Sequence, residues 1–189
     1  MDKVVLLPDM NILYDHQMFS IQRYGGITKY FCEVISRFDD RNHFELALLC
    51  SENAHLREHA DTFHKRNVIP RANFPKKETV RRWLYSLNNR YSLSRIRKGR
   101  YDIFHPTFYH PYFLNDLRKP FVLTVHDLIE FRFSEQMPGR AFRRKEMETT
   151  IRKAKRLIAI SRHTKNDLVE LFNIDPADID VIHHGYNLP

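Results

Sequence analysis

The sequence predicts an α/β fold in which a doubly wound, mainly parallel sheet lies between two layers of helices. Short apolar runs alternate with helical patterns along the chain, which is the order of elements in parallel sheets with right-handed crossovers. Several runs, such as 121–125 (FVLTV), are apolar throughout, as expected of strands buried on both faces. At 189 residues the chain can form one buried core but is short for two complete domains.

The strands expected from the apolar runs lie at 11–15, 44–50, 67–70, 101–104, 121–125, 156–160 and 178–182. Between the first two, residues 27–38 carry apolar side chains at the i, i+3, i+4, i+7 spacing of a helix that buries one face. Further helices are expected at 53–63, 140–155 and 162–172, and Ser161 is well placed to cap the last of them.

A long basic helix is expected before Gly99, a residue suited to ending a helix. Its expected apolar face is imperfect and consists of Val80, Trp83, Leu84, Leu87, Tyr91 and Ile96.

Positive charge is concentrated in two segments. The chain has 31 Lys and Arg against 23 Asp and Glu, a net charge of +8. Residues 76–100 hold nine basic residues against one acid, and residues 140–156 hold eight against two. Such segments attract anionic lipid, phosphate or acidic glycan, but they are equally expected as solvated helix faces. No helix-turn-helix, RNP or zinc signature accompanies the charge, so we do not expect a nucleic-acid partner.

The cysteine content and the start of the chain predict a cytoplasmic protein. Cys32 and Cys50 are the only cysteines and form no CxxC pair, as is usual in a reducing compartment. The four apolar residues before Pro8 are too few for a signal peptide or a membrane span. Any membrane association is therefore expected to be peripheral, at the inner face of the cell membrane.

The carboxyl ends of the expected strands are the places to look for a ligand site, because ligands of doubly wound sheets bind there. The polar residues and glycines that follow these strands are Asp15, His16, Gly25, Gly26, His105, Pro106, Thr107, His126, Asp127, Ser161, Arg162, His183, His184 and Gly185. Gly25-Gly26 directly precedes a helix, whose free N–H groups favour an anion, although such a pair is also common in simple turns. The phosphate-binding patterns GxGxxG and GxxxxGK[ST] are both missing from the sequence.

His126 is the most interesting of the histidines, because it ends a buried strand. Its position suits either a group that contacts a ligand oxygen or a structural histidine. His105, His183 and His184 are scattered and lack the spacing of metal ligands, so no metal site is expected. No GxSxG nucleophile motif occurs either.

Five segments resemble, in order and spacing, the N-terminal half of group 1 glycosyltransferases of family 4, which have the GT-B fold. They are residues 14–35 (YDHQMFSIQRYGGITKYFCEVI), 103–111 (IFHPTFYHP), 119–133 (KPFVLTVHDLIEFRF), 156–175 (RLIAISRHTKNDLVELFNID) and 179–187 (IDVIHHGYN). The resemblance runs from Met10 to Asn187 and implies a Rossmann-like acceptor-side domain. Residues 1–9 are then expected to be an N-terminal extension and 10–189 the domain.

The resemblance also implies roles for individual residues. Gly25 and Gly26, with Ile27 next to them, would donate backbone N–H groups to the diphosphate of a nucleotide-sugar. His126 would act at the transferred sugar as the catalytic residue, and Asp127 completes its HD motif as a substrate-binding candidate. His105, Pro106 and Thr107 would line the acceptor side.

The reaction implied is sugar transfer to a glycan or lipid-linked acceptor with retained anomeric configuration, without a metal or other cofactor, in cell-surface polysaccharide synthesis. The family's C-terminal nucleotide-sugar domain, with its E-x7-E glutamates, has no counterpart in this sequence. We therefore expect the chain to be inactive alone, since donor binding needs both walls of the cleft. The alternative is a non-catalytic basic module that binds an anionic membrane or glycan.

Overall fold

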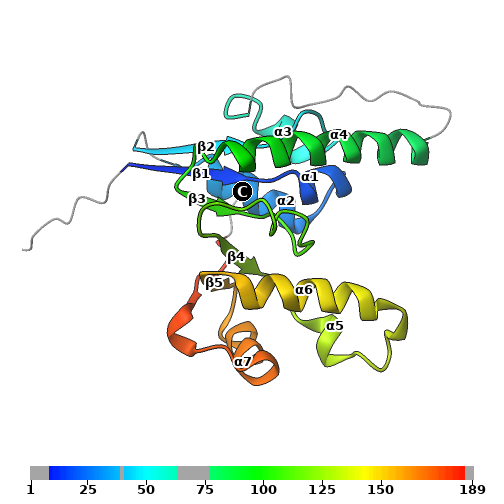
Figure 1. The fold of residues 1–189 in the computed structure, drawn as a ribbon, viewed down its shortest axis with the longest axis vertical. Coiled ribbons are helices and arrows are strands. Elements are labelled where there is room, and N and C mark those ends of the chain that lie inside the picture. Colours follow the sequence, from blue (N-terminus) through cyan, green and yellow to red (C-terminus); the bar gives the residue numbers. More distant parts are fainter. Residues whose placement is uncertain (1–8, 39–40, 64–76, 186–189) are drawn as a thin grey trace, which may run out of the picture.

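Six parallel strands form the centre of this computed structural model, which describes residues 9–38, 41–63 and 77–185 (Figure 1). The first sheet has the order β2-β1-β3 and the second the order β4-β5-β6. The strands are β1 (Met10–Tyr14), β2 (Asn42–Leu46), β3 (Ile103–His105), β4 (Val122–Val125), β5 (Arg156–Ala159) and β6 (Ile179–Val181). Every pairing within the two sheets is parallel, which confirms the predicted Rossmann-like α/β class.

The join between the two sheets is narrow, whereas the sequence predicts one continuous sheet. Phe104 in β3 forms a single parallel bridge with Phe121, and its N–H donates to the Pro120 carbonyl at 3.1 Å. Pro120 has no N–H to donate, so the ladder cannot extend through it. The two sheets therefore meet at one point and hold their carboxyl ends at the same side of the molecule.

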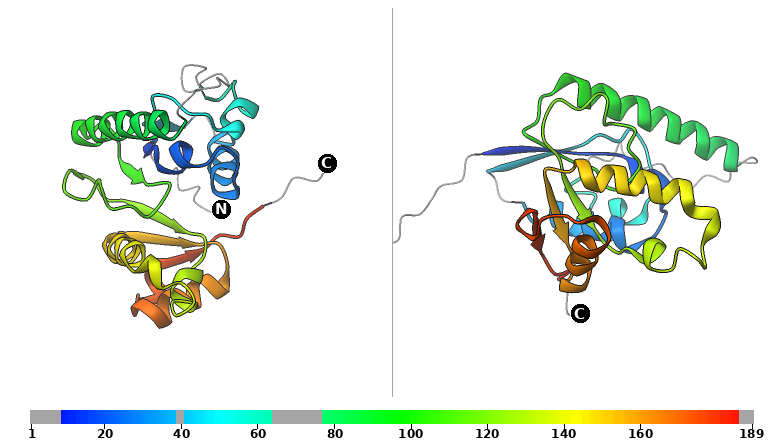
Figure 2. Two further views of the ribbon diagram at one scale, coloured as in Figure 1. Left: turned by 90° about the vertical axis from the view of Figure 1, so that its right-hand side faces the viewer. Right: turned by 60° about the horizontal axis from the view of Figure 1, so that its bottom comes forward.

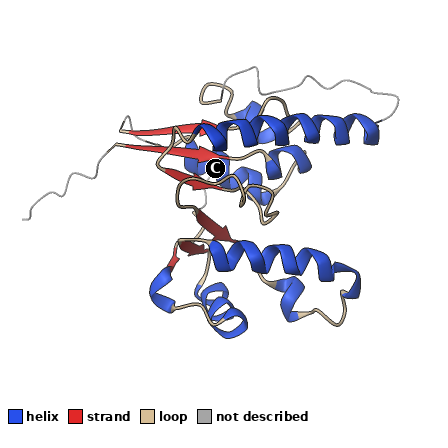
Figure 3. Cartoon of the chain, in the orientation of Figure 1, coloured by secondary structure: helices blue, strands red, loops and turns tan. Residues whose placement is uncertain are grey.

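The helices cover both faces of the strands, and Figure 3 shows the alternation of helices and strands along the chain. They are α1 (Gln17–Ile21), α2 (Gly26–Ile35), α3 (Ala54–Glu58), α4 (Lys77–Lys98), α5 (Ile129–Arg132), α6 (Ala141–Lys153) and α7 (Arg162–Phe172), with 3-10 turns η2 (Pro138–Arg140) and η3 (Pro176–Asp178). In the left view of Figure 2, α4 and α6 lie on one side of the strands and α2 and α3 on the other. This is the expected three-layer arrangement.

Short elements account for most differences from the sequence prediction. Helices α1 and α5 have five and four residues, too few to produce a helical period, and neither is among the helices expected from the sequence. The strand expected at 44–50 ends at Leu46, after which Ala47 and Leu48 stay buried without strand pairing. The strand expected at 67–70 lies outside the described residues.

Apolar side chains form two adjoining core clusters. One spans both sheets and packs β3, β4 and β5 against α6 and α7 through residues such as Phe104, Leu123, Leu157 and Phe172. The other lies between β1, β2, α2 and α3. Burial of Phe31 and Ile35 in this second cluster confirms the predicted apolar face of α2.

Helix α4 buries only part of the face expected: Ile96 is fully buried and Tyr91 packs against the first core cluster, but Trp83 does not. Trp83 is 61% exposed, whereas Asn88 and Ser92 are buried. Asn88 can be buried because its amide is fully used: Oδ1 accepts from the N–H groups of Leu49 and Cys50, and Nδ2 donates to Ser20 and to the Cys50 carbonyl. Hydrophobicity alone could not identify this face, since its central contacts are hydrogen bonds.

The predicted helix ends are confirmed at two positions. Gly99 follows α4 with φ of 64°, the left-handed conformation that glycine adopts without steric cost. Ser161 caps α7, its Oγ accepting from the N–H of Thr164 at 3.0 Å.

The carboxylate of Asp15, fully buried just after β1, ties the first strand to the loop after β3. Oδ1 accepts from the N–H and hydroxyl of Thr107 at 2.8 and 2.7 Å. Oδ2 accepts from Gln17 Nε2 at 2.7 Å and from the Tyr112 hydroxyl at 3.2 Å. A buried carboxylate is tolerated only when such donors replace its hydration.

We predict that Asp15→Asn lowers the free energy of unfolding by about 2–4 kcal/mol. The new amide group would point N–H donors at groups that already donate, which leaves buried donors unpaired. Chemical denaturation measures the change. Asp61→Asn, the same substitution at an exposed site, should stay within about 0.5 kcal/mol, and equal effects of the two would contradict the prediction.

Candidate active site

The N-terminus of α2 is open. Its N-cap residue, Gly25, has no side chain to cap the helix, so the N–H groups of Gly26, Ile27 and Thr28 receive no such bond. A Cβ added to Gly26 would meet nothing within 4 Å, and one on Gly25 would meet only the flexible end of Gln22. Gly25 is therefore packed against the Gln22 side chain, whereas the space at Gly26 is open.

The glycine loop, residues 22–26, is held in place by Asn53. Asn53 Nδ2 donates to the Gln22 carbonyl at 2.8 Å and to the Thr28 hydroxyl at 3.0 Å. The N–H of Ala54 also donates to the Arg23 carbonyl at 2.9 Å. These bonds fix the direction of the free N–H groups before any ligand arrives, which is how a preorganised anion site works.

His126, Tyr30 and His184 form a ring cluster one helical turn from the glycine loop. The Tyr30 ring lies edge-on to His126, with centroids 5.3 Å apart, and stacks on His184 at 4.9 Å. The Tyr30 hydroxyl also lies 3.4 Å from the Thr124 hydroxyl of β4. Tyr30 therefore connects α2 to the carboxyl end of β4, where His126 follows the strand.

His126 presents an unused hydrogen-bonding atom. Its Nε2 is buried without a partner in the described part of the chain, while its backbone N–H donates to the Tyr109 hydroxyl at 3.0 Å. Burial, with a smaller contribution from His184, lowers the pKa of His126 to about 4. The imidazole is thus neutral at pH 7, and its Nε2 can donate or accept one hydrogen bond, depending on its tautomer.

His105 lies in the core, only 8% exposed, between the rings of Tyr14 and Phe31. Its Nε2 is 3.0 Å from the Thr124 hydroxyl. Burial, with a smaller contribution from His126, lowers the pKa of His105 to about 3. This placement suits a residue that supports the site from behind.

The other predicted contact residues occupy different environments. Thr107 is buried and bonded to Asp15, so its hydroxyl is already used. Asp127 is exposed and its carboxylate accepts from the Ile129 N–H at 3.2 Å. Ile27 is half-buried at the open helix end. His183 donates from Nδ1 to the Ile160 carbonyl at 3.2 Å.

In the structure, Gly26 and His126 therefore lie at one edge of the sheets and are connected through Tyr30. His105 and Thr107 are buried below this edge. Among the described residues no group of three or more His, Cys, Asp or Glu side chains is placed to hold a metal ion. The described helices also include none that is long and apolar enough to span a membrane.

Comparison with family models gives a match to Glycosyltransferase Family 4 over residues 24–188. The chain belongs to glycosyltransferase family 4. No curated protein matches it significantly. The matched range of this family 4 domain includes both the open N-terminus of α2 and His126.

The sequence did not reveal three residues that contribute to this candidate site. Tyr30 was placed in the apolar face of its helix, and nothing in the spacing distinguishes a tyrosine that bridges two elements from one in the core. Asn53 was placed at the start of a helix, but its bonds to the glycine loop depend on tertiary packing. His184 follows the last strand, as expected of a site residue, without any signal that it contacts Tyr30.

We predict that the domain loses stability as the pH falls from 7 toward 5. Below the ordinary histidine pKa of about 6.5, the unfolded chain binds protons at positions 105 and 126, whereas the folded chain resists protonation until pH 4 or below. In this range each of the two histidines lowers the free energy of unfolding by up to about 1.4 kcal/mol per pH unit. Urea unfolding at a series of pH values measures the slope.

Variants of single histidines test what causes this change in the free energy of unfolding with pH. His105→Gln keeps a donor for Thr124 and should flatten the pH dependence, while His43→Gln, at an exposed site, should leave it unchanged. A slope that is the same in wild type and in His105→Gln would contradict the assignment.

Proposed function

We propose that this family 4 domain is the acceptor-side half of a retaining glycosyltransferase. It would help to transfer a sugar from a nucleotide-sugar to a glycan or lipid-linked acceptor in cell-surface polysaccharide synthesis, on the cytoplasmic side of the membrane. The observation that carries the proposal is the uncapped α2 N-terminus at the same sheet edge as the His126 Nε2, which has no partner among the described residues.

The open helix end suits the diphosphate of the donor. The backbone N–H groups of Gly26, Ile27 and Thr28, together with the positive end of the helix dipole, favour a negatively charged group. The bonds from Asn53 hold this loop, so binding requires little rearrangement.

A neutral His126 suits an interaction with the transferred sugar. As the bond to the leaving diphosphate breaks, positive charge develops at the anomeric carbon, and a protonated histidine nearby would oppose it. The low pKa of His126, caused mainly by burial, keeps the imidazole uncharged at pH 7. Its Nε2 can then form a hydrogen bond with a sugar oxygen that strengthens in the transition state.

We predict that the 189-residue chain by itself transfers sugar at a negligible rate and that fusion to a family-type nucleotide-sugar domain gives activity. The open helix end and His126 form one wall of a cleft, and orientation of the donor needs groups from a second wall. Steady-state assays with a panel of nucleotide-sugars compare the two proteins. Robust transfer by the chain alone would contradict the need for a second wall.

In the fused protein, His126→Ala should lower kcat and kcat/KM together, by about tenfold for each ~1.4 kcal/mol of transition-state stabilisation that the substitution removes. His126→Gln retains a polar group and should recover part of the rate. His43→Ala is the matched control at an exposed site, and thermal melting checks folding. An unchanged kcat in His126→Ala would assign His126 a purely structural role.

Binding to an anionic membrane is a second candidate function, supported by exposed aromatic side chains beside basic ones. Many basic residues of the two charged segments are neutralised by ion pairs. These pairs are Arg95 with Glu45, Arg97 with Asp116, Arg140 and Arg143 with Glu130, Arg152 with Glu148, and Arg156 with Asp178 and Asp180. By contrast, Arg82 has no ion pair among the described residues, its neighbour in the chain, Trp83, is 61% exposed, and Phe142 is 75% exposed.

We predict that vesicles containing an anionic phospholipid shift the fluorescence of Trp83, the single tryptophan, to shorter wavelength. Interfacial aromatic residues insert while arginines bind head groups, and high salt screens the attraction. Trp83 fluorescence in anionic and neutral vesicles, at low and high salt, measures the effect, and Phe142→Ala should weaken binding. Equal shifts with neutral vesicles, or an effect that salt does not reduce, would remove the electrostatic explanation.

A further inference from the structure

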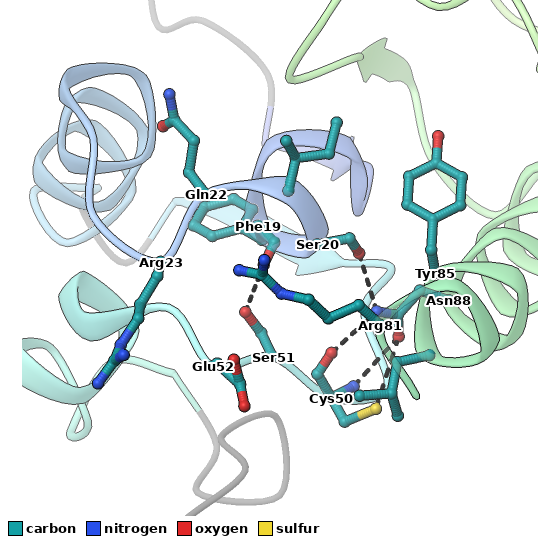
Figure 4. Close-up of a pocket in the computed structure, with 12 residues that line it drawn as sticks. Phe19, Ser20, Gln22, Arg23, Cys50, Ser51, Glu52, Arg81, Tyr85 and Asn88 are labelled. Carbon is teal, nitrogen blue, oxygen red and sulfur yellow. Dashed lines mark hydrogen bonds between the residues drawn. The ribbon is translucent and has the colours of Figure 1, made fainter. Parts of the chain in front are cut away.

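A recess separate from the His126 cluster lies between α1, α4 and the segment after β2 (Figure 4). It contains about 370 Å³ of empty space, counted together with its open mouth. Phe19 and Leu84 give it apolar walls, and Ser51 and Asn88 give it polar ones. Part of this space is open solvent, so the recess is a shallow surface site that can contact one small polar group of a ligand rather than enclose it.

Arg81 provides the recess with a cation that has no ion pair or hydrogen bond among the described residues. Its side chain extends from α4 toward Phe19 and Ser51 in Figure 4. Arg23 adds a second positive charge at the opposite side, its guanidinium 5.8 Å from the centre of the Tyr24 ring. The recess therefore attracts an anion.

Glu52 adds one carboxylate to the same lining, and it too has no ion pair within the described chain. A carboxylate accepts hydrogen bonds from hydroxyl groups and repels a second anion. The combination of two arginines with one glutamate therefore favours a ligand that carries both an anionic group and hydroxyl groups.

The remaining polar groups of the lining are already bonded to one another. Ser51 donates to the Phe19 carbonyl. Asn88 Nδ2 donates to Ser20 Oγ and to the Cys50 carbonyl, each at 2.8 Å. These bonds make the walls rigid and leave Arg81, Arg23 and Glu52 as the groups able to bind a ligand.

The recess lies next to the glycine loop. Gln22 and Arg23 belong both to its lining and to residues 22–26, and the Gln22 side chain sits against Gly25. Three peptide units separate Arg23 from Gly26, which limits their Cα atoms to a separation of about 11 Å. A molecule held here would thus lie near a diphosphate bound at the start of α2.

We propose that the recess is an acceptor subsite that binds the phosphate group of a hydroxyl-bearing acceptor through Arg81 and Arg23, with Glu52 accepting from an acceptor hydroxyl. The proposal rests on the proposed function, since it names the acceptor class of that transferase. Arginine is suited to phosphate because its planar guanidinium can donate two parallel hydrogen bonds.

The test is a titration of the 189-residue chain with glycerol 3-phosphate, followed by amide chemical shifts in NMR. We expect saturable shifts around residues 20–23, 50–52 and 81–88. Arg81→Met should weaken binding about tenfold or more, as expected when a charge-assisted bond is removed. Arg90→Met removes the same charge from an exposed site on α4 outside the recess and should have little effect. Glu52→Gln should tighten phosphate binding several-fold, because it removes a nearby negative charge.

A parallel arm uses phosphatidylcholine vesicles with and without phosphatidic acid, and it distinguishes a lipid-borne phosphate from a free one. Arg81-dependent binding of either probe supports the subsite and identifies the source. The subsite is overturned if neither probe binds, or if Arg81→Met and Arg90→Met weaken binding equally. The two hypotheses can fail separately, because binding to the recess needs no turnover. If the fused protein binds a probe but transfers no sugar, the proposed function is refuted and the subsite is not. A recess that binds neither probe in an active fused protein would refute this subsite alone.

Discussion

The buried carboxylate of Asp15 is the interaction on which the active edge of this domain depends. It lies where β1 ends, and its donors come from the start of α1 and from the loop after β3. Loss of hydration makes a buried carboxylate costly, so the donors must stay in place and the two loops must stay together. The positions of α1 and of the segment containing Tyr109 follow from this constraint.

Burial determines the chemistry of the histidines at this edge. His105 is the last residue of β3 and His126 directly follows β4, and each lies against aromatic rings where a positive charge would be poorly solvated. Both imidazoles are therefore neutral, but they differ in their bonding. His105 uses its Nε2 on Thr124, whereas the Nε2 of His126 has no partner in the described part of the chain. The same residue type is thus hydrogen-bonded at one strand end and has an unpartnered ring nitrogen at the next.

Net charge is a poor guide to where this protein attracts anions. Much of the excess in the segment 140–156 is held in ion pairs with Glu130, Glu148 and the residues near β6. The positive charge that is not held in ion pairs is local. It is found at the start of α2 and in the first half of α4 around Arg81. The start of α2 belongs to the glycine loop, and the recess lined by Arg81 shares Gln22 and Arg23 with that loop, so the two places lie close together.

The sequence by itself determined the fold class, the family, most helices, and the two glycines and His126 as site candidates. Periodicity and strand-end position are local features, and neighbouring residues in the chain are enough to specify them. Tertiary structure alone decided that Asn88 is buried and Trp83 exposed, that the sheet is interrupted at Pro120, and that Tyr30 and Asn53 complete the site. Each of these depends on hydrogen bonds or packing between segments distant in the chain, and such partners leave no periodic trace in the sequence.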